Sequence, residues 1–127
     1  GRIINITSIA VRTPFPGLAM SSASRSALTA LVASVSREVA AHNVTINNLQ
    51  PGIFETDRMM TGLKGAAKAT GRSIEDTRAG MLSNIPAGRF GDPDEFGHAC
   101  AFLCSSHSGF ITGQSFLLDG GHFPGIF

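Results

Sequence analysis

The chain of 127 residues is long enough for one small domain, and its 43% hydrophobic and 15% charged residues are typical of a globular protein with a core. The formal net charge of +1 gives no broad electrostatic footprint for nucleic acid, so we expect no nucleic-acid partner. No uninterrupted apolar run approaches membrane-spanning length and no secretory leader is visible, so we expect no membrane association and a cytoplasmic protein.

The first part of the chain predicts a strand, a loop, a long helix and a second strand. A short apolar run with a polar end suits a buried strand at Arg2–Ser8, and two prolines and a glycine make Arg12–Gly17 a loop. The Ala-rich stretch Leu18–Ala41 predicts a helix, and Val44–Leu49 predicts a strand that the following Pro-Gly pair stops. Strands joined by one crossover helix should lie parallel. The expected buried face of the helix consists of Leu28, Leu31, Val32, Val35 and Val39.

The segment from about residue 54 to residue 85 predicts a helical insertion. Glu55–Leu63 can form a short helix, and Lys64–Gly71 is small, polar and Gly-containing, which predicts a flexible connection. Ser73 is the expected N-cap of a second helix that ends near Asn84. Insertions of this kind act as lids or substrate loops, and the alternative is a surface helical pair with packing duties only.

The last part of the chain predicts one more helix and a third strand. Asp92 is a suitable N-cap for a helix that ends near Ser105, because Pro93 fits the first helical position and Glu95 completes a capping box. Ser115–Leu118 follows as a strand. The order of elements predicts an α/β fold of three parallel strands with flanking helices, which is half of a doubly wound α/β domain.

The two ends of the chain carry expectations of their own. The chain begins directly before a buried-type strand, whose edge would be bare, so we expect a fragment whose missing part supplied the neighbouring strands. The tail His122–Phe127 is too apolar for a free tail, and we expect it to dock, for instance on another subunit.

The cysteines do not predict a metal centre. Cys100 and Cys104 lie four positions apart in a helical pattern and are expected to be small buried thiols. A site that combines them with His98 and His107 matches no familiar zinc spacing, and no carboxylate is placed to complete it, so we expect no metal.

Five phrases resemble the short-chain dehydrogenase/reductase family in order and spacing, over nearly the whole chain. They are GRIINITS, the Ala-rich helix, VTINNLQPG with Thr56 after it, PAGRFGDPDEF, and ITGQSFLLDGG. The resemblance implies that residues 1–127 are the C-terminal part of a single Rossmann-fold domain, with a substrate loop at about 54–85. The Gly-rich phosphate-binding turn and the residue that selects the cofactor would lie upstream, so NAD or NADP would be bound mainly by the missing half.

The resemblance assigns the catalytic positions to Ser8, Ser21 and Arg25. Family members place a serine at the end of the strand that matches Arg2–Ser8, a tyrosine 13 residues on and a lysine four beyond that; here these positions hold Ser8, Ser21 and Arg25, and the chain contains no tyrosine. A phenol beside an ammonium can shuttle a proton near neutral pH, whereas an aliphatic hydroxyl is a far weaker acid. Arg25 can still hold a ribose hydroxyl, and Ser8 can still donate to a carbonyl oxygen. The alternative is that Ser21 and Arg25 are a helix N-terminal turn and a solvated cation.

The cofactor-binding assignment rests on the loop after the second strand. Pro51, Gly52, Ile53 and Thr56 match the family loop that grips the nicotinamide amide, in which the residue after Pro-Gly uses its backbone and the threonine its hydroxyl. Gly52 would allow a close backbone approach to the cofactor, and Pro51 stiffens the turn. The alternative is that this Pro-Gly pair merely ends a strand.

The resemblance implies an NAD(P)-dependent oxidoreductase with an unidentified carbonyl or alcohol substrate, and the chain alone is not expected to be active. The alternative is a non-catalytic relative that binds a nucleotide or a partner. A serine hydrolase is excluded because neither Ser8 nor Ser21 lies in a Gly-flanked nucleophile turn. Family members commonly form homodimers or homotetramers, and a second side of the long helix carries small residues that suit such pairing, namely Ala23, Ala27, Ala30 and Ser34.

Overall fold

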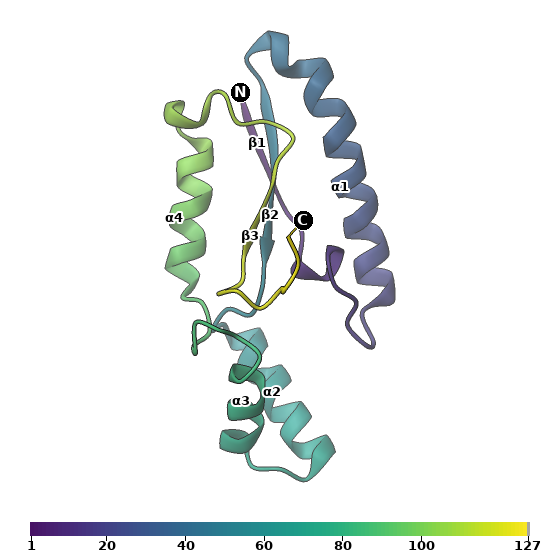
Figure 1. Ribbon diagram of the computed structural model, residues 1–127, viewed down its shortest axis with the longest axis vertical. Coiled ribbons are helices and arrows are strands. Elements are labelled where there is room, and N and C mark those ends of the chain that lie inside the picture. Colours follow the sequence, from purple (N-terminus) through teal and green to yellow (C-terminus); the bar gives the residue numbers. More distant parts are fainter. Residues whose placement is uncertain (127) are drawn as a thin grey trace.

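A three-stranded parallel sheet forms the centre of the computed structural model, which describes residues 1–126 (Figure 1). β1 (Arg2–Ile6), β2 (Thr45–Pro51) and β3 (Ser115–Leu118) lie side by side in that order, and both pairings are parallel. The predicted order and direction of the strands are confirmed. Because all strands run the same way, their carboxyl ends meet at one edge, where open α/β sheets bind their ligands.

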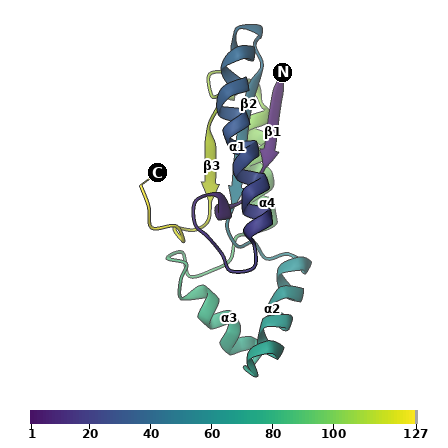
Figure 2. The ribbon, with the colours of Figure 1, turned by 90° about the vertical axis from the view of Figure 1, so that its right-hand side faces the viewer.

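Two helices cover opposite faces of this sheet, as predicted. α1 (Ala19–Val39) lies on one face and α4 (Pro93–Cys104) on the other, in both views (Figures 1 and 2). α4 begins at the predicted cap, since Asp92 accepts a hydrogen bond from the Asp94 N–H and Glu95 accepts one from the Asp92 N–H, each at 2.9 Å. No helix within residues 1–126 combines the length and the apolarity needed to cross a bilayer. Short 3₁₀ turns occur at Ile9–Val11, Ala40–His42 and Ser106–Ser108.

The buried face of α1 differs from the predicted one. Val32 is buried, but Leu31 is 57% exposed, and Ser36 is buried in its place. Residues 32 and 36 lie on one line of the helix, whereas residue 31 is turned about 100° away. Ser36 fits because Gly113 lies directly opposite, and a Cβ on that glycine would lie 2.8 Å from the Ser36 Oγ. Two small residues thus allow α1 to approach the turn before β3.

The first helix of the insertion is longer than predicted. α2 spans Asp57–Thr70 instead of Glu55–Leu63, so the prediction of a flexible segment at Lys64–Gly71 is wrong. The alanines and lysines of this segment are strong helix formers, and they outweigh the cost of about 1 kcal/mol for the internal Gly65. The helix ends at Gly71, whose left-handed φ of 67° forms the C-cap.

The second helix of the insertion, α3 (Ile74–Leu82), begins at the predicted cap. The Ser73 side chain accepts a hydrogen bond from the Asp76 N–H at 2.9 Å. α2 and α3 form a V that projects beyond the carboxyl edge of the sheet (Figure 2). The insertion therefore lies beside the edge at which open α/β sheets bind their ligands.

β2 is buried along nearly its whole length although it carries three amide side chains. The Asn47 Nδ2 donates to the Ile111 carbonyl at 2.8 Å, and its Oδ1 accepts from the Gln114 N–H at 3.0 Å. Asn47 thus satisfies part-buried backbone groups of the turn that leads into β3. The apolar core around this strand consists of Ile9, Ala10, Val32, Ile46, Leu49, Leu63, Ala67, Ile85, Phe90 and Leu103.

Asn47→Ala is expected to lower the free energy of unfolding by about 1–3 kcal/mol, because the fully buried Asn47 amide bridges the Ile111 carbonyl and the Gln114 N–H, and both part-buried hydrogen bonds are lost. Urea denaturation of the purified protein measures the change. Asn84→Ala is the matched control, since Asn84 is exposed and its amide donates only to the Gly80 carbonyl. The control should change stability by less than about 0.5 kcal/mol, and equal losses in both variants would contradict the bridging role of Asn47.

The cysteines of α4 are not the pair of buried thiols that the sequence predicts. Cys104 is exposed and Cys100 is half-buried. Burial, followed by the neighbouring Cys104, raises the pKa of the Cys100 thiol above its ordinary value. A protonated thiol is a poor nucleophile and a poor metal ligand. The part of the chain that the structure describes holds no group of three or more side chains that could bind a metal ion.

Candidate functional site

A cleft of about 550 Å³ lies at the carboxyl edge of the sheet, bounded by the strand ends, the start of α1 and the α2–α3 insertion. It brings together residues that are far apart in the sequence, from the end of β1, from α1 and from the loop after β2. The structure places every residue that the sequence assigns to the site in the lining of this one cleft, namely Ser8, Ser21, Arg25, Pro51, Gly52, Ile53 and Thr56. Their chemical roles remain predictions.

Ser8 lies where the backbone leaves β1. The strand ends at Ile6, two residues earlier than predicted, because the Ser8 Oγ accepts a hydrogen bond from the Ala10 N–H at 3.1 Å and caps the turn Ile9–Val11. The cap uses the oxygen as an acceptor and leaves the hydroxyl hydrogen available. Ser8 can therefore still donate a hydrogen bond into the cleft.

Arg25 is fixed at the end of β1 by hydrogen bonds to neutral oxygens. Its Nε donates to the Thr7 carbonyl at 3.1 Å, and its Nη1 donates to the Ser21 carbonyl at 3.3 Å and to the Ser21 Oγ. Arg25 is half-buried, so it is not a freely solvated cation. Its Nη2 has no hydrogen-bond partner within residues 1–126 and is the part of the guanidinium that a ligand can reach.

Together these side chains provide three hydrogen-bond donors and no suitable acid. The Ser21 Oγ accepts from Arg25, so its hydrogen is left to donate, as in Ser8. A guanidinium stays charged at any physiological pH, and an aliphatic hydroxyl is too weak an acid to match a proton transfer near neutrality. The group can stabilise a negative oxygen in the cleft without supplying a proton to it.

Position 52 requires a glycine because the end of β3 lies too close for a side chain. Its N–H donates to the Leu118 carbonyl at 2.8 Å, which continues the pairing of β2 with β3. A Cβ on Gly52 would lie 2.7 Å from the Cβ of Asp119 and 2.8 Å from its Cα. The close backbone approach that the sequence attributes to the cofactor is thus, in this structure, an approach to β3.

The next residues of the same loop offer donors that fit an amide. The Ile53 carbonyl accepts from the Gly91 N–H at 3.0 Å, while the Ile53 N–H has no partner in the described part of the chain. The Thr56 Oγ1 accepts from the Met59 N–H at 3.2 Å and caps α2, which leaves its hydroxyl hydrogen available. Both groups line the cleft, so the loop fits the nicotinamide carboxamide that the sequence predicts there.

The sequence predicts a substrate loop at about 54–85, but it did not identify which residues of this insertion line the cleft. Arg58, Met59 and Ala66 of α2 and Met81 of α3 line its far side. The spacing of residues 59, 63 and 66 on one helical face was the available signal. Arg25 and Arg58 are the only charged residues of the lining, and neither has a carboxylate within ion-pair distance in residues 1–126. The cleft is therefore positive and favours anionic or electron-rich ligands.

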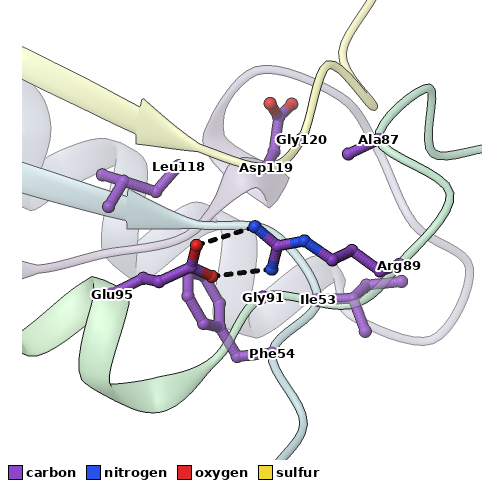
Figure 3. A pocket seen from close by; sticks show the side chains of 9 residues that line it. All are labelled: Ile53, Phe54, Ala87, Arg89, Gly91, Glu95, Leu118, Asp119 and Gly120. Carbon is purple, nitrogen blue, oxygen red and sulfur yellow. Dashed lines mark hydrogen bonds and ion pairs between the residues drawn. The ribbon is translucent and has the colours of Figure 1, made fainter.

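A smaller cavity of about 190 Å³ lies between the loop after β2, the start of α4 and the end of β3 (Figure 3). Arg89 and Glu95 face each other there in a bidentate ion pair, with N–O distances of 2.8 and 2.7 Å. Asp119 points away from this pair, and its oxygens accept from the Gly121 and Phe123 N–H groups. The charged groups of this cavity are thus used by the fold, and it carries no candidate chemistry.

Glu95→Gln is expected to weaken the dependence of stability on acid pH. The hydrogen bonds from Arg89 and from the Asp92 N–H lower the pKa of Glu95 from 4.5 to about 2. Because the folded pKa lies below the unfolded one, the stabilisation is present above about pH 4.5 and is lost as the pH falls towards 2. Urea denaturation across this pH range measures the effect. Glu75→Gln, an exposed acid on α3, should keep the parent's pH dependence, and an equally steep loss in the Glu95 variant would contradict the prediction.

Comparison with known proteins defines the class. The family model described as enoyl-(acyl carrier protein) reductase matches residues 1–122, and the chain belongs to the short-chain dehydrogenase/reductase family. Curated relatives include the 3-oxoacyl-[acyl-carrier-protein] reductases of Vibrio harveyi, 39% identical, and of Escherichia coli (strain K12), 36% identical, each over 121 residues that make up 95% of this chain and 45% of the relative.

A solved structure agrees with this assignment. YwfH, an NADPH-dependent reductase involved in bacilysin biosynthesis, superposes with a TM-score of 0.92 at 32% identity, over 99% of this chain and 48% of that one. The actinorhodin polyketide ketoreductase, solved with NADPH, gives a TM-score of 0.88 at 25% identity, over 96% of this chain and 47% of that one. The chain spans about half the length of the relatives that it matches.

Proposed function

We propose that this chain is the C-terminal half of an oxidoreductase subunit that uses NAD or NADP to reduce a small carbonyl compound or oxidise an alcohol. The observation that carries the proposal is that the predicted oxygen-binding and nicotinamide-binding residues line one cleft. The NADPH-dependent reductase and the 3-oxoacyl reductases among its relatives support the same chemistry. Because the chain spans about half of these relatives, the cofactor phosphates would be held mainly by the other half.

The residues of the cleft divide into two groups in this proposal. The nicotinamide, when bound, supplies or accepts the hydride. The Ile53 N–H and the Thr56 hydroxyl bind its carboxamide, and Arg25 Nη2 with the two serine hydroxyls binds the substrate oxygen. None of these side chains is matched to donate a proton near neutral pH, so the proton comes from water.

The missing acid favours one kind of carbonyl substrate. Reduction of a saturated ketone leaves an alkoxide, a strong base that needs a proton as it forms. Reduction of an α,β-unsaturated carbonyl places the hydride on the β-carbon and leaves an enolate, whose oxygen is far less basic and which water can protonate at the α-carbon. Three hydrogen-bond donors without a proton-donating acid suit the enolate better than the alkoxide, because they stabilise the negative charge on oxygen and supply no proton. The enoyl reductase description of the matching family model agrees with this choice.

The test is an assay of the complete subunit with NADPH and NADH, using an α,β-unsaturated carbonyl compound and the corresponding saturated ketone as a matched pair. We expect cofactor oxidation with the unsaturated compound and a much lower rate with the ketone. Turnover of the ketone alone would contradict the preference for conjugated substrates. Saturable cofactor binding without turnover of any carbonyl or alcohol would instead identify a non-catalytic relative.

We also propose that the complete subunit forms a homodimer or homotetramer through the outer side of α1. The large apolar residues Met20 and Leu31 are 85% and 57% exposed there. A two-fold axis would bring this side against its own copy. The predicted contribution of the tail is weaker, because Phe123 is half-buried on its own subunit, and Phe127 lies outside the described residues. The small residues predicted for this contact are all exposed, namely Ala23, Ala27, Ala30 and Ser34.

Leu31→Glu is expected to lower the mass of the complete subunit in light scattering to that of a monomer. A two-fold contact would bury the new carboxylate of both subunits in one interface, and an unpaired buried charge strongly opposes association. Lys64→Glu is the control, because Lys64 is exposed on α2, away from α1, and its charge reversal should leave the assembly intact. An unchanged mass for Leu31→Glu would remove the case for this interface.

A further inference from the structure

The C-terminal tail folds back onto the segment that joins Ser8 to α1 (Figure 1). Asp119, directly after β3, fixes the direction of the tail. Its Oδ1 accepts a hydrogen bond from the Gly121 N–H at 2.9 Å, and its Oδ2 accepts one from the Phe123 N–H at 2.7 Å. The carboxylate thus forms a compact turn from backbone groups of the tail. Residues 122 and 123 are thereby held in place, and both are half-buried.

Arg12 is the residue that meets the tail from the other side. Its Nε donates to the Gln50 Oε1 at 2.6 Å, and its Nη2 donates to the Ser115 carbonyl at 3.1 Å. Gln50 is 1% exposed, so the guanidinium reaches into the sheet and joins β2 to β3. The same guanidinium lies over the Phe123 ring, 5.8 Å from its centroid. Arg12 therefore ties the turn after Ser8 to two strands and to the tail at once.

A second contact joins the same two segments. The rings of Phe15 and His122 meet edge to face, with centroids 6.1 Å apart. The backbone of the segment from residue 12 to residue 18 is bonded near its ends, from Arg12 and Thr13 to the Ile9 carbonyl and from Leu18 to the Phe15 carbonyl, and Pro14 and Pro16 have no N–H to donate. The contacts that join this segment to the tail are made by the side chains of Arg12 and Phe15.

The chemistry of Arg12 fits a positioning role better than a charge-pairing role. No carboxylate within residues 1–126 forms an ion pair with it, and its side-chain hydrogen-bond acceptors in this part of the chain are a neutral amide and a backbone carbonyl. A guanidinium presents several donors in a rigid, planar fork and can also lie flat on an aromatic ring. A lysine at this position could not reproduce all three contacts.

We propose that Arg12 is a positioning residue that, together with Phe123 of the tail, holds the segment between Ser8 and Ser21 in its active geometry. Ser8 caps the turn that ends at Arg12, and Ser21 lies in the first turn of the helix that the segment leads into. The inference rests on the proposed function, because Arg12 and Phe123 would hold the segment that carries the oxygen-binding residues Ser8 and Ser21. The nicotinamide-binding loop Pro51–Thr56 has hydrogen bonds of its own, from the Gly52 N–H to the Leu118 carbonyl and from the Glu55 N–H to the Gly91 carbonyl, and Arg12 makes no hydrogen bond within it.

The test compares Arg12→Gln, Arg12→Lys and Phe123→Ala with the control Phe110→Ala in the complete subunit. Phe110 is a fully exposed phenylalanine that lies outside the cleft lining. The readouts are amide hydrogen exchange of residues 9–18, kcat, and KM for the nicotinamide cofactor. We expect Arg12→Gln to speed exchange in residues 9–18 much more than in β1 or β2, and to lower kcat by about tenfold or more while the cofactor KM changes far less. Phe123→Ala should act in the same direction, Arg12→Lys should restore part of the loss, and Phe110→Ala should resemble the parent.

Two results would overturn the inference. Unchanged exchange of residues 9–18 in Arg12→Gln and Phe123→Ala would show that the contacts of Arg12 and Phe123 do not hold the segment. A second result is an exchange rate that rises in β1 and β2 as much as in residues 9–18, with kcat and the cofactor KM both changed. That result would show a general loss of stability instead of a positioning role for Arg12. If the parent subunit turns over no substrate, the proposed function fails, and the pattern of hydrogen exchange still decides whether the tail holds this segment.

Discussion

Replacing Ser21 by Tyr and Arg25 by Lys together is expected to raise the rate of saturated ketone reduction by the complete subunit by roughly 10²–10⁴-fold, the usual contribution of a positioned general acid. The two side chains already contact each other across one helical turn. Both line the cleft and are only half-buried, so the larger phenol can extend into the cleft. A lysine ammonium would lower the pKa of the phenol and bring it closer to the working pH. The measurement is kcat/KM with the ketone of the matched pair.

The control for this prediction removes only the phenol oxygen. Ser21→Phe with Arg25→Lys fills the same space and carries the same ammonium, but it has no acidic hydroxyl. We expect its rate of ketone reduction to lie at or below the parent's, because it also loses the Ser21 hydroxyl and the Arg25 guanidinium, while the tyrosine variant gains activity with a pH dependence that reflects its phenol. Equal rates in the two double variants would show that the missing acid is not what limits this cleft.

Elements that depend on neighbouring residues were predicted closely from the sequence. β3 agrees with Ser115–Leu118 at both ends, and α4 begins at its cap because Asp92, Pro93 and Glu95 fix the backbone within one turn. The parallel strand order followed from the handedness of crossover connections. The residues of the cleft could be found because the family motifs fix Ser8 and Thr56 relative to the strand ends.

Features that depend on distant residues could not be predicted in this way. Helical periodicity assigns Leu31 to the buried face, and only the folded chain shows that Ser36 lies there, because Gly113 faces it from a later turn. The contact of Arg12 with Phe123 likewise joins opposite ends of the chain. No local pattern marks either contact, since each depends on how the strands bring separate segments together.

The loop after β2 offers a test of packing in which one added methyl group is decisive. Gly52 does not have a left-handed φ, so an alanine at this position meets no backbone strain. The obstacle is steric, because its Cβ would lie 2.7 Å from the Asp119 Cβ and 2.8 Å from the Asp119 Cα. The second of these atoms belongs to the backbone and cannot rotate away. The end of β3 must therefore move, and with it the edge of the cleft.

Gly52→Ala is accordingly expected to lower the free energy of unfolding by about 1–3 kcal/mol, the usual cost of overpacking, and to weaken cofactor binding because Ile53 follows directly. Gly65→Ala is the matched control. Gly65 lies inside α2 and is exposed, and apart from the backbone of its own helix and its chain neighbours no atom of residues 1–126 lies within 4 Å of an added Cβ. Since alanine is the better helix former, that variant should gain about 0.5–1 kcal/mol. Urea denaturation and fluorescence titration with NADPH measure the two effects. A Gly52→Ala protein as stable as its parent would show that β3 does not press against this loop, and the close approach would then have to serve the cofactor instead.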